Sequence, residues 1–399
     1  MSNGDHALTD LDQDLRAAIG EGPVPFPDNI KREFEPWHRP RKQFIRESQW
    51  AREVGFLARD LKLDHGELRY LTLPGNDLLD IRHLEQTVCT QLDIKLKYLG
   101  FKSSNASSHR QQPELSSSEF SVKRLEHIDP ESEVFPGDFR KVGDSHSVLW
   151  LRVHREKPFH AINIDLCGGF ASSEKATGVP NYFAALKALL QHQANSNEDS
   201  LLFLTTRMDE GNIDPEKGDV LLRVAQEIHD CCPKYATEIA AAWTGAALSE
   251  KVVLGEIVTP AEAFMLGLTQ WIIAASIQSR LKVSVKSFMT YRTGSDEGDD
   301  DITSIAVRLS PDPIVEPDRH GLVRPNPKDK SANDKECIQS TTVPRKVRNR
   351  TQVDDVLRTD PGEFQRCLDG SSSLLTAAGY QKAEYITWVM RESHRYAVS

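Results

Sequence analysis

The chain has 399 residues, with 49 basic and 59 acidic side chains and a formal net charge of −10 at pH 7. This length allows one large domain with additions or two to three smaller domains. The acidic balance argues against a protein whose whole surface coats nucleic acid, although it allows a local basic groove. No apolar run approaches the roughly 18 to 20 residues that cross a bilayer, and residues 1–5 lack the features of a signal peptide. We therefore expect a cytoplasmic protein without membrane contact.

The six cysteines form no C-x-x-C pair and have no histidine partner at zinc-finger spacing. A disulfide between the adjacent Cys231 and Cys232 would be strained, and reduced thiols suit an intracellular compartment. We predict no metal site and free thiols at all six positions, which are Cys89, Cys167, Cys231, Cys232, Cys337 and Cys367.

The N-terminal part divides into a flexible arm (1–28) and a basic helical segment (29–64). After Pro40, apolar residues recur at helical intervals, which predicts an amphipathic helix with Arg and Lys on its outer face. Near its start lies a basic cluster, interleaved with aromatic residues, that consists of Arg39, Arg41, Lys42 and Arg46. This mixture suits phosphate pairing and base stacking, so nucleic acid or another phosphorylated ligand is one expected partner of residues 31–52. An intramolecular contact or a partner protein is the alternative.

Strands and helices alternate between residues 65 and 310. Short apolar runs bounded by Gly or Pro predict strands at 68–73, 94–100, 132–135, 161–165 and 201–206. Amphipathic patterns predict helices at 77–92, 145–154, 181–194 and 217–231, and the Ser-rich segment 103–118 an exposed loop. Helical patterns between 234 and 280 precede two strand-like runs, 282–292 and 302–309, that predict an antiparallel hairpin. The expected fold class is α/β, with a Rossmann-like, mostly parallel sheet, a terminal antiparallel β-hairpin, and N-terminal and C-terminal helical additions.

Two further segments follow this domain. Residues 311–350 are dense in Pro, Asp and Lys with little periodicity, which predicts a linker, and residues 351–399 form a helical C-terminal region.

Chemically versatile residues follow several predicted strands. Asp165 and Cys167 come at the end of an apolar run, and Arg207 directly follows the run 201–206. Ligands of open α/β sheets bind beyond the carboxyl ends of the strands, so these side chains are expected to share one ligand edge. Asp165 has capping of the next helix as its alternative role, and Cys167 has packing in the core.

The order of five β-α steps followed by a hairpin resembles the class I S-adenosylmethionine-dependent methyltransferases, whose sheet ends in an antiparallel strand inserted beside the fifth. This resemblance implies S-adenosylmethionine as cofactor, methyl transfer as activity, and Asp165 and Cys167 as catalytic candidates. It also implies cofactor contacts at the ends of the first three strands, from Leu73, Pro74, Gly75, Asp77, Asp80, Gly100, Asp138 and Phe139. Asp77 and Asp80 have an alternative role as first-turn helix acids, and Pro74-Gly75 as a simple tight turn.

The sequence departs from the family pattern at two places. The usual glycine-rich motif is reduced to Pro74-Gly75, and Gly100-Phe101 stands where an acidic residue normally ends the second strand. Two functions are therefore expected: a methyltransferase-like enzyme with nucleic acid as one acceptor, or a catalytically silent scaffold of the same fold that binds a nucleotide, nucleic acid or partner protein.

Overall fold

The computed structural model describes residues 33–103, 111–173, 178–245, 253–293, 299–312 and 331–393. Residues Glu35–Ser399 form one compact unit, and the features below belong to it. The predicted N-terminal arm lies outside the described residues.

An eight-stranded sheet forms the centre of this unit, in the order β3-β2-β1-β4-β5-β7-β6-β8. The pairs among β3, β2, β1, β4 and β5 are parallel, and β7 runs antiparallel between β5 and β6. This order, with an antiparallel strand beside the fifth, confirms the predicted Rossmann-like fold class. The strands are β1 Glu67–Thr72, β2 Lys95–Lys102, β3 Glu133–Pro136, β4 Ala161–Gly169, β5 Ser200–Arg207, β6 Leu281–Tyr291, β7 Ile302–Pro311 and β8 Thr351–Gln352.

Helices cover both faces of the sheet because successive strand residues point to opposite sides. Leu71 and Ile162 belong to the hydrophobic cluster on one face, whereas their neighbours Tyr70 and Ala161 belong to the cluster on the other. The first cluster packs against α7 Val148–Arg155, α8 Tyr182–Gln193, α9 Pro215–Cys231, α10 Pro233–Ile239, α11 Leu254–Ile257, α12 Pro260–Gln278 and α14 Val343–Arg348. The second packs against α2 Pro40–Ile45, η2 Arg46–Ala51, α3 Arg52–Asp60, α4 Leu79–Leu84, η3 Glu85–Cys89, α6 Gln111–Lys123, α15 Val353–Thr359 and α16 Pro361–Ala377.

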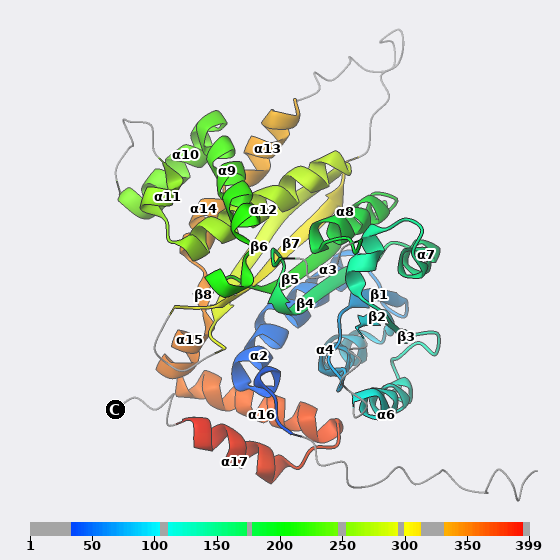
Figure 1. Ribbon diagram of the computed structural model, residues 1–399. Coiled ribbons are helices and arrows are strands. Elements are labelled where there is room, and N and C mark those ends of the chain that lie inside the picture. Colours follow the sequence, from blue (N-terminus) through cyan, green and yellow to red (C-terminus); the bar gives the residue numbers. More distant parts are fainter. Residues whose placement is uncertain are drawn as a thin grey trace, which may run out of the picture. The chain divides into compact units, whose positions relative to one another are not determined.

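The N-terminal and C-terminal helices lie in one layer. In Figure 1, α2 (blue) lies beside α16 (orange), with α17 Lys382–Ser393 (red) below them. The Tyr385 hydroxyl donates to the backbone carbonyl of His38 (2.7 Å), and Nε of Arg41 pairs with Asp354 (3.0 Å). The C-terminal region therefore holds the basic helical segment against the sheet.

α12 corrects the expectation that no apolar segment approaches membrane-spanning length. By length and composition its 19 residues could cross a membrane, yet 67% of its most apolar window is buried inside the fold. It packs closely on α9, because a Cβ on Gly267 would overlap the Leu221 carbonyl. α12 thus has the packing of a core helix.

Two segments that the sequence predicted as irregular contain helices. α6 begins within the predicted loop 103–118 and continues to Lys123. Its Val122 belongs to the second cluster, and its Leu115 packs against that cluster. The predicted linker 311–350 contains α13 Ala332–Ser340 and α14, whose Val343 and Val347 lie one turn apart and are both buried. In both segments a few apolar residues at helical spacing are surrounded by polar ones, which hid the periodicity.

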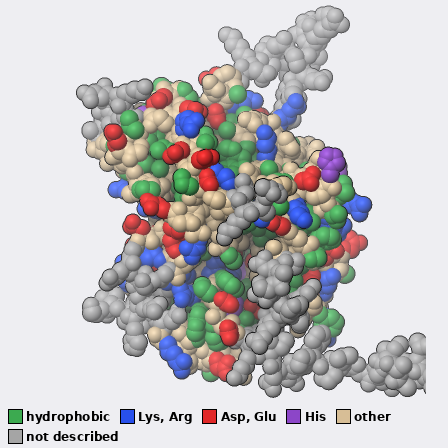
Figure 2. Space-filling model, viewed as in Figure 1, with side chains coloured by type: hydrophobic (Ala, Val, Ile, Leu, Met, Phe, Trp, Pro, Cys, Tyr) green, Lys and Arg blue, Asp and Glu red, His purple; other side chains and the backbone are tan. Residues whose placement is uncertain are grey.

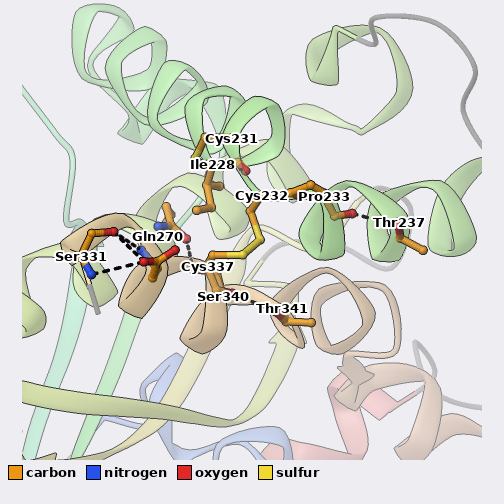
Figure 3. Close-up of a disulfide and its surroundings, with 11 residues drawn as sticks. Ile228, Cys231, Cys232, Pro233, Thr237, Gln270, Ser331, Cys337, Ser340 and Thr341 are labelled. Carbon is orange, nitrogen blue, oxygen red and sulfur yellow. Dashed lines mark hydrogen bonds between the residues drawn. A yellow bond between two sulfur atoms is a disulfide. The ribbon is translucent and has the colours of Figure 1, made fainter. Parts of the chain in front are cut away.

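The prediction of six free thiols was wrong for one pair. Cys232, where α9 ends, forms a disulfide with Cys337 of α13, and their Cα atoms are 5.4 Å apart (Figure 3). The partners are 105 residues apart in the chain, so their spacing carried no signal. The other four cysteines are free, as predicted.

Candidate functional site

A cavity of about 420 Å³ lies at the carboxyl edge of the sheet, within the common range for small-molecule sites. The ends of β1, β2, β4, β5 and β6 and the start of β7 form its floor, and the N-terminal helical segment covers it. The lining from the strand ends includes Leu73, Pro74, Gly75, Asp77, Asp80, Lys102, Asp165, Cys167, Arg207, Tyr291 and Arg292. The lining from the helical segment consists of Pro36, Trp37, Arg39, Arg41, Lys42, Arg46 and Trp50.

The basic cluster faces this cavity, which corrects the expectation that it lies on the outer face of a helix. Arg41, Lys42 and Arg46 are only 3–4% exposed. The helix buries Arg41 and Lys42 together with apolar residues because carboxylates from distant elements, Asp354 and Asp165, pair with them. Periodicity finds the apolar side of a helix, but it does not distinguish a polar cavity from solvent.

Lys42 and Asp165 form the central ion pair of the cavity. Nζ of Lys42 lies 2.6 Å from Oδ1 of Asp165 and 4.7 Å from the ring centre of Trp50. Burial lowers the pKa of Lys42, but Asp165 and Tyr291 outweigh it, so that the pKa is raised overall. Asp165 therefore lies at the ligand edge, as the strand-end rule predicted, with a lysine already bound to it.

Cys167 also lines the cavity and its side chain is exposed. Loss of solvation and the nearby Asp165 carboxylate raise the pKa of its thiol. Because the thiolate is the nucleophilic form, this environment disfavours covalent chemistry at Cys167.

The loop after β1 forms one wall. Asp77 is held by Nε2 of His38 (3.3 Å) and by the Tyr380 hydroxyl (3.0 Å), which donates to it. Asp80 accepts from the hydroxyls of Tyr70 (3.0 Å) and Thr72 (2.5 Å), and burial raises its pKa. Both acids therefore have partners within the protein.

The same loop is backbone-constrained at one residue. Leu78, fully buried between the two acids, adopts a left-handed conformation (φ 52°) that is uncommon for a residue other than glycine. Gly75 is not among the glycines with a positive φ, and a Cβ there would come no closer than 3.9 Å to its nearest neighbour, Trp37.

Three predicted cofactor residues are not part of the lining. A Cβ on Gly100 would lie 3.0 Å from Val134 and 3.1 Å from Pro74, so this glycine permits close packing of β2. Asp138 pairs with Arg140 (2.5 Å) and caps the following turn. Phe139 is 4% exposed and packs within the first hydrophobic cluster.

The structure adds Lys102, Trp50, Tyr291 and Arg292 to the residues predicted for this site. Lys102 is the last residue of β2, so the strand-end rule identifies it once the strand is extended by two residues beyond the predicted end. Tyr291 likewise ends β6, and it reaches the cavity because the hairpin pairs with β5 through β7. Among the described residues, no group of three or more His, Cys, Asp or Glu could hold a metal ion.

A family model described as PP_RS20740-like matches residues 31–390, nearly the whole of the compact unit. The chain belongs to the PP_RS20740-like family. No curated protein matches it significantly.

Three solved structures of methyltransferases or their subunits resemble this family member weakly. One is a modification subunit of a putative type I restriction enzyme from Vibrio vulnificus YJ016 (9% identity, 76% of this chain and 48% of that one, TM-score 0.31). Another is a type I restriction-modification methyltransferase subunit from Streptococcus thermophilus (9% identity, 90% of this chain and 64% of that one, TM-score 0.32). The third is a loganic acid methyltransferase with SAH (10% identity, 92% of this chain and 94% of that one, TM-score 0.31). The chain thus spans 48% and 64% of the first two proteins. At these TM-scores only the strand order described above supports the fold assignment.

Proposed function

We propose that this chain is a methyltransferase-like protein whose cavity binds a nucleoside-sized small molecule. The observation that supports this is the cavity itself: it lies where ligands of open α/β sheets bind, and residues from the ends of five strands, the start of β7 and the N-terminal segment line it. S-adenosylmethionine-dependent methyl transfer is the activity that the resemblance implies, and it is the first to test.

Part of the cavity fits S-adenosylmethionine. Leu73, Pro74 and Gly75 offer the loop that would wrap its methionine end, and Asp165 lies where an acceptor would be placed. At the ribose and adenine positions the fit fails. Gly100-Phe101 stands where the family has an acid, and the next residue, Lys102, ends β2 on the cavity wall with a positive charge. Asp138 and Phe139 are outside the lining. Because these residues do not fit the cofactor, we assign no step of methyl transfer to the site.

This misfit favours the second candidate, a non-catalytic member of the fold that binds a nucleotide. Nucleic acid and partner-protein binding through residues 31–52 stays a prediction. The burial of Arg41, Lys42 and Arg46 removes the continuous exposed basic helix on which that prediction was based.

Calorimetric titration tests the proposal with four probes: S-adenosylmethionine, S-adenosylhomocysteine, adenosine and adenosine 5′-monophosphate. We expect at least one to release heat at a single site and to raise the melting temperature. Binding of the first two would support the enzyme, and binding of only the others would support the scaffold. Absence of heat and of any thermal shift with all four would reject the cavity as a nucleoside site.

A further inference from the structure

The lining of the cavity is cationic in a chain that is acidic overall. Among the described lining residues, seven carry a positive charge and three a negative one, Asp77, Asp80 and Asp165, so the formal charge of the lining is +4. The whole chain has a formal charge of −10. A cavity with this balance attracts anions.

Most of these cations already have carboxylate partners. Among the described residues, four such pairs are Arg41 with Asp354 (3.0 Å), Arg207 with Asp209 (3.2 Å), Lys42 with Asp165 (2.6 Å) and Arg292 with Asp300 (3.4 Å). Their charges hold the fold together at the sheet edge, and they contribute to the field in the cavity rather than offering a vacant binding group.

Arg46 differs from these residues. Its Nη2 donates to the Trp37 carbonyl (3.1 Å), but within the described part of the chain its Nε has no hydrogen-bond partner and its guanidinium forms no ion pair. The residue is 4% exposed and lines the cavity. A buried guanidinium donor without an acceptor is costly, so a ligand acceptor at this place would be favourable.

Trp50 presents a second such donor. It is 3% exposed, lines the cavity, and its indole Nε1 has no partner among the described residues. Arg46 and Trp50 lie on η2, a π-helical turn between α2 and α3. π-Helical turns are rare and occur frequently at functional sites. Here the turn places two residues, each with an unsatisfied buried donor, in the lining of one cavity.

We propose that Arg46 and Trp50, beside the Lys42 ammonium, form an anion subsite that binds the phosphate of a phosphorylated, nucleoside-sized ligand. A guanidinium matches the geometry of phosphate oxygens, and the surplus of cations suits a doubly charged group better than a carboxylate. The aromatic wall includes Trp37, which is 38% exposed and can stack on a base. This inference rests on the proposed function, since both require that the cavity holds a ligand.

Calorimetry in a phosphate-free buffer tests the subsite on the full chain. We expect adenosine 5′-monophosphate to bind at least about tenfold more tightly than adenosine, and inorganic phosphate to compete with it. Arg46→Gln should weaken binding of the monophosphate about 10- to 100-fold and leave adenosine binding unchanged. The matched control is Arg52→Gln, from the same helical segment, whose side chain is 49% exposed and lies outside the lining; it should bind like wild type.

A second variant protects the test against misfolding. Trp50→Phe keeps an aromatic ring but removes the indole N–H together with part of the ring volume, and it should weaken binding of the monophosphate about 3- to 10-fold. If circular dichroism shows that Arg46→Gln is unfolded, the binding affinity of the Trp50→Phe variant for the monophosphate tests the subsite instead. The inference is overturned if the monophosphate binds no better than adenosine, or if the folded subsite variants bind it like the control. In that case binding of adenosine or S-adenosylhomocysteine would still support the proposed function. If none of the probes binds, both the anion subsite and the proposed function are rejected.

Discussion

At the scale of single residues, the ion pair between Lys42 and Asp165 is the central contact in the lining of the cavity. Lys42 and Asp165 are 123 positions apart, yet they form an ion pair in which the lysine side chain is 4% exposed and the aspartate 26%. The strand-end rule located Asp165 because it depends on local pattern alone. The partner of Asp165 depends on which helix covers the sheet edge, and the residues around Asp165 do not indicate which helix that is.

Breaking this pair should destabilise the fold strongly. Asp165→Asn leaves the Lys42 ammonium buried without a compensating carboxylate, and we expect a loss of about 3 kcal/mol in the free energy of unfolding. Lys42→Met combined with Asp165→Asn should recover part of that loss, because the buried charge is also gone. Urea denaturation of the single and double variants measures both effects. A loss below about 0.5 kcal/mol for Asp165→Asn would show that the pair behaves like a surface ion pair.

Buried histidines should make the protein sensitive to mild acid. Burial and the Arg46 charge lower the pKa of His83 from 6.5 to about 3, and burial and the Arg69 charge lower that of His160 to about 4. Between these values and pH 6.5 the unfolded chain binds more protons than the folded one. Stability therefore falls as the pH drops below 6.5, by about 2 kcal/mol per histidine at pH 5.

Unfolding curves between pH 7 and 5 check this for His83. His83→Gln should flatten the slope of stability against pH, whereas His146→Gln, at a side chain that is 94% exposed, should leave the slope as in wild type. Equal slopes for wild type and His83→Gln would contradict the assignment.

At the scale of elements, prediction succeeded where pattern and environment agreed. β1 and β5 are short apolar runs between turn residues, and both occur within a residue or two of their expected bounds. α13 and α14 were missed because polar residues surround their apolar contacts. A capping box at Ser331 and the pair Val343 and Val347 were the signals available.

The disulfide is the element-scale feature with the clearest chemical readout. It joins α13 to the end of α9, so denatured, unreduced protein should show four reactive thiols, and six after reduction. Cys337→Ser should lower the free energy of unfolding by about 2–4 kcal/mol, because the bond closes a long loop. Thiol titration with mass spectrometry checks the count. Six thiols before reduction would contradict the bond.

At the scale of the whole molecule, the site consists of a sheet edge that could be predicted and a cover of N-terminal and C-terminal helices that could not. The parallel sheet and its ligand edge follow from the alternation of strands and helices, and these were predicted. The cover of the cavity comes from the N-terminal helices, which α16 and α17 support through contacts such as Tyr385 with His38. Acidic and basic side chains are interspersed on the face drawn in Figure 2. The local concentration of positive charge becomes apparent only at the cavity.

The most direct test of a ligand site at this cavity is a crystal structure of the chain grown with adenosine 5′-monophosphate. We predict density for the nucleotide between η2 and the ends of β1 and β4, with a phosphate oxygen within hydrogen-bond distance of the Arg46 guanidinium. Density for the nucleotide at another place on the protein, or a cavity filled by the chain's own side chains, would contradict the account.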